Sequence, residues 1–335
     1  MAQPSALPGA RRVARSPRLP AAGAPLSVRP MSTTPLLAMD LGGTDLKLGR
    51  VGAAGDVHGF VRVPSRAAEG EGALFAAIAA AAAAAEPDRR SAVVGFGSPG
   101  VLDPETGVIQ DRTPHLKLPP EFPMRERLER LLGRRVVIDN DANCAALGEH
   151  LAGAARGARV SITVTVGTGV GAGIVVDGHV LKGAFGGAGE IGHMPLGSTG
   201  PACACGVEGC AEPLASGSGL VSRARERGLA VASGEQVFAS ADPRAAGAIA
   251  ELVDHLARML GAATQLVNPE VIVLGGGLAQ AGERLFASLR TRLERYTLAS
   301  HRRRLRLVPA SLGERAGVIG AGLQAWQAVG EPARR

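Results

Sequence analysis

The sequence predicts an α/β protein of two lobes, each of which begins with a β-meander. Two stretches carry this prediction, because each reads as strand, glycine-threonine turn and strand: LLAMDLGGTDLKLGRV at 36–51 and SITVTVGTGVGAGIVV at 161–176. Alternating helix and strand patterns follow both stretches, which indicates a duplicated βββαβα core. We place the N-terminal α/β lobe at 35–140 and the C-terminal α/β lobe at 141–330.

In the first half, apolar runs between turn signals predict three strands, an alanine-rich helix that ends before Pro87, and then a strand, a helix and a strand. A further helix begins directly after the last of these strands. The predicted strands are 36–40, 46–51, 57–63, 92–97 and 135–139, and the predicted helices are 70–86, 123–132 and 140–151.

The second half repeats the strand, turn, strand pattern and then becomes mainly helical. Its helices show apolar residues at helical spacing, and its later strands are short buried runs. The predicted elements are helices 218–227 and 243–267, strand 270–274, a turn of three glycines, a helix to about Tyr296, strand 305–308 and a last helix from Glu314.

The net charge of +7 is unevenly distributed along the chain. Five arginines and no acidic residue precede Asp40, so this first segment carries +5 and the remainder only +2. A nearly neutral body predicts no nucleic-acid partner. Residues 1–35 hold seven prolines and no hydrophobic periodicity, so we expect 1–34 to be a disordered, dispensable tail.

The apolar content of the chain is spread over short segments. The longest apolar run, at 73–85, has thirteen residues and is too short to cross a bilayer. Nothing in the sequence signals secretion. We therefore expect a cytoplasmic protein with no membrane partner.

Three of the four cysteines lie close together, in the sequence EIGHMPLGSTGPACACGVEGCAE at 190–212. Cys203, Cys205 and Cys210 offer three thiolates, and His193 adds an imidazole, which completes the four-ligand set that structural zinc prefers. The alternative is a Cys203–Cys205 disulfide beside a stray histidine. That bridge would demand unusual backbone geometry, because a single residue separates the two cysteines. The pattern therefore favours zinc held by a loop at 190–212.

The two glycine turns at equivalent places predict a phosphate site. Successive backbone N–H groups without intervening side chains can cradle phosphate oxygens, and a nearby carboxylate can hold Mg²⁺, usually through water. The residues concerned are Asp40, Gly42, Gly43 and Thr44 in the first turn and Gly167, Thr168 and Gly169 in the second. Two structural hairpins without a ligand remain the alternative.

Asp141 follows a predicted buried strand, at the place where open α/β sheets present their reactive groups. One interpretation makes it a helix N-cap. The other makes it the carboxylate that orients a hydroxyl and accepts its proton during phosphoryl transfer. We favour the second interpretation.

Together, E-x-G-H, the C-x-C-G-x-x-G-C-x-E pattern and VIDNDANCAALGE resemble the signatures of the ROK family of repressors and sugar kinases, over about residues 36–330. The resemblance implies a two-lobed, actin-like ATPase (ribonuclease H-like) sugar-kinase fold. It implies Asp141 as the catalytic base and an adenosine site at the glycine turn after the strand at 270–274. The residues that it assigns to sugar binding are Asn140, Asp141, Glu190, His193 and Glu212, and those that it assigns to adenosine are Gly275, Gly276 and Gly277.

We therefore predict an ATP-dependent hexokinase that uses Mg²⁺ and a structural Zn²⁺ and makes glucose 6-phosphate from glucose. The small-molecule partners would be ATP and the hexose, and we expect a homodimer or higher oligomer. Fructokinase and N-acetylmannosamine kinase remain open. A non-catalytic sugar-responsive regulator is the alternative from another class. The repressors of this family carry a helix-turn-helix, for which the proline-rich tail offers no match.

Overall fold

The computed structural model describes residues 34–111, 113, 116–198 and 200–330. The predicted tail at 1–34 lies outside these residues except for Thr34, so its disorder stays a prediction. In the described part of the chain, the helices are too short or too polar to cross a bilayer.

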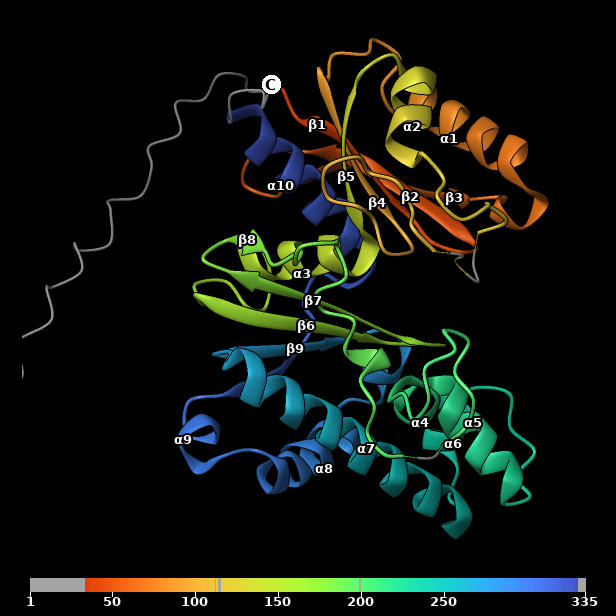
Figure 1. Ribbon diagram of the computed structural model, residues 1–335, viewed down its shortest axis with the longest axis vertical. Coiled ribbons are helices and arrows are strands. Elements are labelled where there is room, and N and C mark those ends of the chain that lie inside the picture. Colours follow the sequence, from red (N-terminus) through yellow and green to blue (C-terminus); the bar gives the residue numbers. More distant parts are fainter. Residues whose placement is uncertain (1–33, 112, 114–115, 199, 331–335) are drawn as a thin grey trace, which may run out of the picture. The chain divides into compact units, whose positions relative to one another are not determined.

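The first sheet is mixed and has five strands in the spatial order β3-β2-β1-β4-β5 (Figure 1). The first three strands form an antiparallel meander, and β4 and β5 run parallel to β1. β1 and β4 are apolar along most of their length and buried throughout, as expected for strands covered on both faces. The strands are β1 (Leu36–Leu41), β2 (Asp45–Val51), β3 (Val57–Pro64), β4 (Val93–Ser98) and β5 (Arg135–Asn140).

The second sheet repeats this arrangement, with the order β10-β9-β6-β7-β8. β6, β7 and β8 form the meander, and β9 and β10 run parallel to β6. The predicted duplication is confirmed. The two-residue strand β8 was not predicted, because its sequence is too short to carry a pattern. The strands are β6 (Val160–Val166), β7 (Val170–Val176), β8 (His179–Val180), β9 (Val271–Gly275) and β10 (Arg306–Pro309).

The long predicted helices are present, and shorter ones join them. The α-helices are α1 (Glu71–Ala85), α2 (Met124–Leu132), α3 (Asp141–Leu151), α4 (Glu212–Ala215), α5 (Gly217–Glu226), α6 (Gly234–Ala239), α7 (Pro243–Val267), α8 (Glu283–Leu293), α9 (Ala299–Arg302) and α10 (Ala316–Gly330). Short 3₁₀ helices cover Ala67–Glu69, Ile191–His193, Gly277–Ala281, Glu294–Tyr296 and Gly313–Arg315. The helix expected to run to Tyr296 is therefore divided. Gly282 interrupts it, because its φ of 57° lies in the left-handed region.

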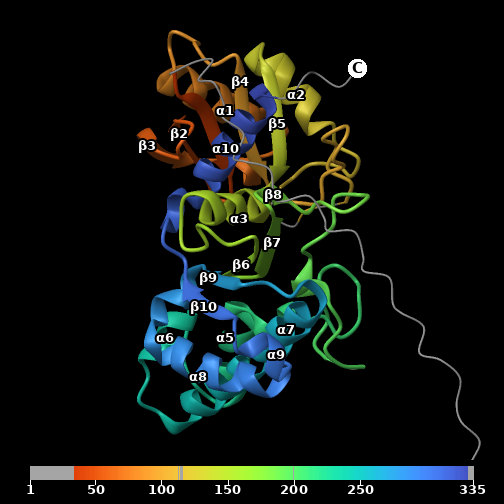
Figure 2. The ribbon, with the colours of Figure 1, turned by 90° about the vertical axis from the view of Figure 1, so that its left-hand side faces the viewer.

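The helices α3 and α10 cross over between the sheets. Each follows a strand of one sheet and packs against the other sheet. α3 follows β5 and packs against β6 and β7, whereas α10 follows β10 and packs against β1 and β4 (Figure 1). The view in Figure 2 agrees. The two helices also cross each other. At the crossing, a Cβ on Gly320 would clash with the carbonyl oxygen of Cys144, so the two backbones touch without a side chain between them.

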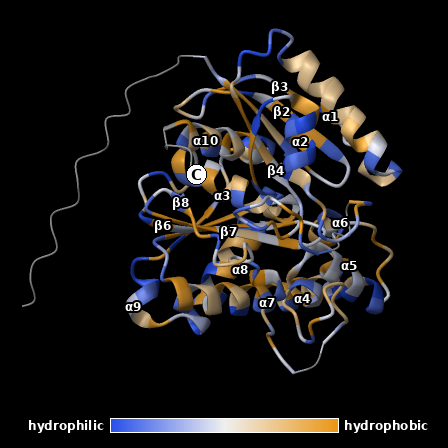
Figure 3. Cartoon of the chain, turned by 45° about the horizontal axis from the view of Figure 1, so that its top comes forward, coloured by the Kyte–Doolittle hydropathy of each residue, from blue (hydrophilic) through white to orange (hydrophobic). Residues whose placement is uncertain are grey.

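Each sheet has its own hydrophobic core. The first core lies between the first sheet and helices α1 and α2, and it includes Met39, Ile78, Phe96 and Leu128. The larger second core lies under the second sheet and includes residues of α5, α6, α7 and α8. In Figure 3, α2 has mostly hydrophilic colour, whereas alanine-rich α1 has mostly hydrophobic colour. The two cores fix the strand ends at which the candidate site residues lie.

Candidate active site

A cavity of about 1250 Å³ is lined by residues from both sheets and from the segments that follow them. The predicted site residues that line it are Asp40, Asn140, Asp141, Gly167, Gly169, Glu190, His193, Cys205, Glu212, Gly276 and Gly277. The remaining predicted residues lie outside the lining: Gly42, Gly43, Thr44, Thr168, Cys203, Cys210 and Gly275. Most of the predicted site is therefore brought together around one cavity.

Asn140 is the N-cap of α3, and Asp141 is the first residue of that helix. The Asn140 Oδ1 accepts hydrogen bonds from the backbone N–H groups of Ala142 and Asn143, at 2.8 and 3.2 Å. The Asn140 Nδ2 donates to the Gly100 carbonyl oxygen at 3.1 Å, which leaves one amide hydrogen for another partner. The N-cap interpretation of Asp141 is thus wrong, because its neighbour has that role.

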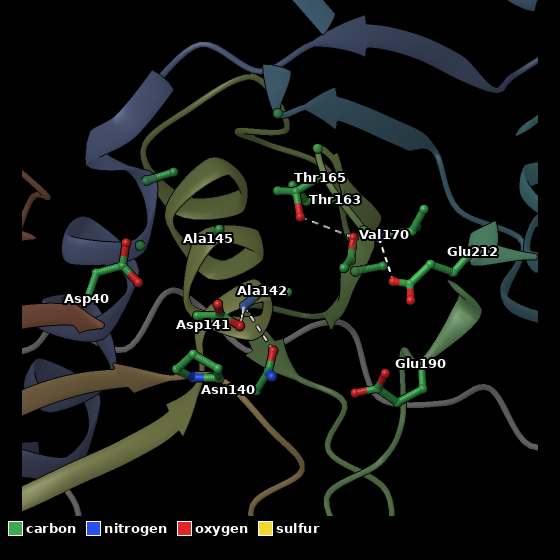
Figure 4. Close-up of a pocket in the computed structure, with 18 of the residues that line it drawn as sticks. Asp40, Asn140, Asp141, Ala142, Ala145, Thr163, Thr165, Val170, Glu190 and Glu212 are labelled. Atoms are coloured by element: carbon green, nitrogen blue, oxygen red, sulfur yellow. Dashed lines mark hydrogen bonds between the residues drawn. The ribbon is translucent and has the colours of Figure 1, made fainter. Parts of the chain in front are cut away.

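The Asp141 carboxylate is poised to exchange a proton near neutral pH. Desolvation, followed by repulsion from Asp40, raises its pKa to about 7; a hydrogen bond from the Ala142 N–H opposes the shift, and Glu190 adds to it. Figure 4 shows Asp141 between Asp40 on one side and Glu190 and Glu212 on the other. A carboxylate with this pKa suits general-base chemistry.

Asp40 lies near the end of β1 and is paired with Lys47 of β2, whose Nζ lies 3.3 Å from the Asp40 Oδ2. Burial raises the pKa of Asp40, and Lys47 opposes that shift. α10 approaches the carboxylate so closely that a Cβ on Gly317 would clash with it. The charge at this position therefore depends on β1, β2 and the N-terminal turn of α10 together.

Glu190 and Glu212 enter the cavity from segments that follow the second meander. Glu190 precedes the 3₁₀ helix Ile191–His193, and Glu212 begins α4. Burial raises the pKa of Glu190, with His193 opposing the shift and Glu212 adding to it. The Glu212 Oε2 accepts a hydrogen bond from the Val170 N–H at 2.8 Å (Figure 4). This contact fixes one oxygen of Glu212 and leaves the other available.

The four predicted zinc ligands form a compact cluster. One donor atom from each of His193, Cys203, Cys205 and Cys210 lies within 4.8 Å of the others, and all four cysteines of the chain are free thiols. The Cys203 Sγ lies 3.5 Å from the His193 Nδ1, and the Sγ atoms of Cys205 and Cys210 are also 3.5 Å apart. Zn–S bonds of about 2.3 Å place tetrahedral ligands roughly 3.7 Å apart, so the donor set fits zinc.

The cluster closes the base of a loop. The Leu196 N–H donates to the Gly209 carbonyl at 2.9 Å, and the Ala211 N–H donates to the Met194 carbonyl at 3.0 Å. These bonds hold the segment after His193 against the segment before Glu212. The His193 Nδ1 faces the cysteines, while its Nε2 lies 3.9 Å from the Glu190 Oε2 on the cavity side. The imidazole thus connects the metal cluster with the cavity.

The two glycine turns differ in their relation to the cavity. Gly167 and Gly169 line it, and the second turn is held from behind, where the Gly217 N–H donates to the Gly167 carbonyl at 2.8 Å. The first turn is held by Ser65, whose Oγ donates to the Gly43 carbonyl at 3.2 Å. The third glycine turn contributes Gly276 and Gly277 to the lining.

Lys47, Thr163 and Thr165 also line the cavity, although no sequence motif pointed to them. Lys47 could have been found from the hairpin, because the antiparallel register places it opposite Asp40. The threonines alternate along β6 with buried valines and isoleucine, a pattern that also describes an ordinary strand. Their place in the cavity follows only from the packing of α3 and α10.

The ROK family profile matches residues 36–328, nearly all of the described chain. The chain belongs to the ROK family. Among ROK proteins, it is 35% identical to a glucokinase from Halalkalibacterium halodurans over 321 residues, which cover 87% of this chain and 95% of that protein. An N-acetylmannosamine kinase from Escherichia fergusonii and the DNA-binding transcriptional repressor Mlc of Escherichia coli are also related, at 32% and 30% identity.

Solved ROK structures share the fold. A ROK hexokinase from Thermus thermophilus has a TM-score of 0.79 and 37% identity, over 88% of this chain and 98% of that chain. A ROK glucokinase from Streptomyces griseus, solved with glucose and AMPPNP, has a TM-score of 0.76 and 30% identity, over 88% of this chain and 99% of that one. The expected two-lobed, actin-like α/β fold of the ROK kinases is confirmed.

Proposed function

We propose that this ROK protein is an ATP-dependent hexokinase that phosphorylates the 6-hydroxyl of glucose. The observation that carries the proposal is Asp141, a carboxylate whose pKa is raised to about 7 in a cavity that also holds Asp40, Glu190 and Glu212. The glucokinase relatives, and the glucose and ATP analogue bound by the Streptomyces griseus protein, support the choice of substrates.

Asp141 acts as the base in this mechanism. Its carboxylate accepts the proton of the sugar 6-hydroxyl as that oxygen attacks the γ-phosphorus of ATP, and the bond between the γ-phosphorus and the bridging oxygen breaks to release ADP. The raised pKa places the group near neutral pH, where it can be unprotonated before the reaction and still accept a proton during it.

The sugar is held from two sides. Asn140 offers its free amide hydrogen, and Glu190, His193 and Glu212 offer acceptors and a ring nitrogen from the opposite side. Hydrogen-bonding groups built for a hydroxyl remain unpaired when that hydroxyl is missing or inverted, at a cost of about 1–3 kcal/mol each. Glucose should therefore be preferred over epimers such as mannose.

The nucleotide would lie along the glycine turns. We assign the phosphates to Gly167, Thr168 and Gly169 and to the first turn at 42–44, and the adenosine to 275–277. Mg²⁺ neutralises phosphate charge when bound, and the Asp40 carboxylate would hold it, through water. Asp40 suits this role because its buried carboxylate faces the same cavity as Asp141.

We assign a structural zinc to His193, Cys203, Cys205 and Cys210. The purified protein should contain about one zinc per chain, and Cys205→Ser should lose it along with glucose affinity, because the metal holds the loop between Glu190 and Glu212. Elemental analysis and glucose titration measure both effects. Cys144→Ala is the control, since Cys144 lies at the crossing of α3 and α10 and should leave the zinc in place. Undiminished glucose turnover by metal-free protein would contradict this role.

N-acetylmannosamine kinase is the second candidate, because a protein of that name is 32% identical to this chain. A regulator without catalysis is disfavoured because the chain has Asp40, both glycine turns and Asp141, with Asp40 and Asp141 in the same cavity. Location in the cytoplasm and a homo-oligomeric state stay predictions.

The test is ADP release from ATP and Mg²⁺, measured by a coupled assay with glucose, mannose, fructose and N-acetylmannosamine. Glucose should give the highest kcat/KM. A tenfold preference for another sugar would overturn the glucokinase assignment but keep the kinase. Binding of a sugar without any turnover would overturn the kinase as well.

Asp141→Asn tests the base directly. It keeps the size of the side chain but cannot accept the proton, so kcat should fall by at least about 10²-fold while glucose still binds. A variant with nearly unchanged kcat would place the base elsewhere, with Glu190 as the next candidate.

A further inference from the structure

The buried carboxylate of Asp139 joins segments that are far apart in the sequence. Asp139 is the next-to-last residue of β5 and directly precedes Asn140. Its Oδ1 accepts from the Asn140 N–H at 2.7 Å and from the Asn143 Nδ2 at 2.9 Å. Its Oδ2 accepts from the Gln324 Nε2 of α10 at 2.7 Å and lies 2.8 Å from the Lys182 Nζ. Lys182 is the cation of this group, and it comes from the segment after β8.

Lys182 lies at the base of the segment that leads to Glu190. The Leu181 N–H donates to the Ile174 carbonyl at 2.8 Å, and the Ala188 N–H donates to the Lys182 carbonyl at 3.1 Å. These bonds close residues 182–188, here called the clasp segment, into a compact loop. Glu190 follows its last residue by only two positions. A contact of the Lys182 side chain therefore limits where Glu190 can lie.

The tip of the clasp segment also contacts the first half of the chain. The Gln110 Nε2 donates to the Phe185 carbonyl at 2.6 Å, and Gly186 approaches the Leu102 carbonyl so closely that a Cβ would clash with it. The clasp segment is thus anchored to the first half at its tip by neutral contacts. At its base, Lys182 supplies a charged contact to the end of β5, the strand that directly precedes Asp141.

Removal of the Lys182 amine leaves the Asp139 carboxylate with other partners. The Lys182 side chain is 34% exposed, so its amine stays partly solvated, whereas the Asp139 side chain is only 6% exposed. Asp139 keeps three neutral donors when the amine is removed. Loss of Lys182 should therefore leave the fold intact and loosen the position of the clasp segment.

We propose that Lys182 is a positioning residue that, through Asp139, holds Glu190 in register with Asp141 for sugar binding. The proposal rests on the proposed hexokinase function. Lys182 touches neither reactant in this role. Its removal should raise the KM for glucose and leave the KM for ATP nearly unchanged, because none of the hydrogen bonds described for residues 182–188 reaches a glycine turn.

The experiment compares Lys182→Met, Lys182→Arg and Lys117→Met in steady-state kinetics and thermal melts. Lys182→Met should raise the glucose KM about tenfold, since displacement of a binding group by about 1 Å has effects of this order or larger. Lys182→Arg keeps the charge and should restore the glucose KM to within about threefold. Lys117 is exposed and does not line the cavity, so Lys117→Met should behave like the wild type.

Hydrogen–deuterium exchange provides a readout independent of turnover. Lys182→Met should speed amide exchange across residues 183–193 and leave exchange in α7 unchanged. The proposal would be overturned if Lys182→Met had the same glucose KM and the same rates of amide exchange as the wild type. A general loss of Tm with equal changes in both KM values, not restored by arginine, would also overturn it, because Lys182 would then be merely structural. If the wild type had no hexokinase activity, only the proposed function would be overturned. Hydrogen–deuterium exchange of Lys182→Met would still decide whether Lys182 positions the clasp segment.

Discussion

The hairpins β1–β2 and β6–β7 have the same backbone pairing but different side chains at the equivalent position. In the first hairpin, Leu41 and Leu46 form the pair next to the turn, and the preceding pair is Asp40 and Lys47. In the second hairpin the same register place holds Thr165 opposite Gly171, and the Thr165 Oγ1 donates to the Gly171 carbonyl at 3.3 Å. Duplication has kept the backbone of the hairpin, and only one copy carries charge.

The turns of the two hairpins also differ, because only the glycines of the second turn line the cavity. The first turn closes with the Gly42 N–H donating to the Asp45 carbonyl at 2.7 Å, and its glycines do not line the cavity. The second turn is shorter, with the Gly167 N–H donating to the Gly169 carbonyl at 3.0 Å, and both glycines line the cavity. The first hairpin therefore supplies charge to the cavity, and the second supplies bare backbone. Three predictions test this division.

The largest effect is expected for Asp40→Asn, which removes the charged side chain of the first hairpin. Because Asp40 is the proposed anchor for the magnesium of the nucleotide, kcat should fall by at least about 10²-fold, the scale of losing one electrostatic group at a reacting centre. Steady-state kinetics with varied Mg²⁺ measure this. Asp45→Asn is the control in the same hairpin, since Asp45 does not line the cavity and pairs with the exposed Arg62. Equal losses in both variants would show a folding defect of the hairpin instead.

An intermediate effect is expected for Gly167→Ala in the second turn. The added methyl group would meet nothing within 4 Å in the protein, so Tm should not change. It would instead occupy space where we place phosphates, and the KM for ATP should rise about tenfold, which is about 1.4 kcal/mol. Gly42→Ala is the matched change in the first turn, and we expect a smaller rise there. Equal rises would mean that the two turns lie equally close to the phosphates, although Gly42 does not line the cavity.

The smallest effect concerns pH and the two charges of the first hairpin. Asp141 must be unprotonated to act as a base, so kcat/KM for glucose should fall as pH drops below its pKa of about 7. Lys47 lowers this pKa and Asp40 raises it. In pH–rate profiles, Lys47→Met should therefore move the acid limb of kcat/KM to higher pH. In the residual activity of Asp40→Asn, the acid limb should lie at lower pH than in the wild type. Shifts in the reverse directions would exclude Asp141 as the titrating group.

The same raised pKa affects stability. A carboxyl whose pKa rises from 3.8 to about 7 on folding binds its proton more tightly in the native state. Its contribution to the free energy of unfolding is therefore complete below about pH 4 and is lost as pH rises through about 7. This stability is lost over the same pH range, around 7, in which Asp141 loses its proton and can act as a base. The protein would therefore become less stable as it becomes active.

The sequence predicted the parts of the fold that depend on local pattern. The strands β1, β2, β3, β6 and β7, the alanine-rich α1 and the proline-started α7 follow from periodicity and capping over short windows. The zinc cluster was also predictable, because its four ligands lie within eighteen residues, 193–210. The prediction failed at Gly282, where a single residue with positive φ divides a helix whose apolar spacing continues on both sides.

Other features depend on contacts that no local pattern carries. The exchange of α3 and α10 between the sheets joins residues that are far apart in the sequence, such as Gln324 and Asp139, which are 185 positions apart. The Lys182–Asp139 pair joins the segment after β8 to the end of β5, which no local pattern indicates. Lys47 lay within reach of prediction, because hairpin register alone places it opposite Asp40.

The path of α10 sets the order in which a newly made chain can finish folding. The first sheet is complete when residue 140 has been synthesised, but one of its faces is covered by α10, which begins only at Ala316. Ala38 and Val51 of that sheet pack against Val318 and Ala321, and the Trp326 Nε1 donates to the Val51 carbonyl at 2.9 Å. On the ribosome, this apolar face stays open while nearly two hundred further residues emerge. The nascent first half is therefore exposed to aggregation until the last helix arrives.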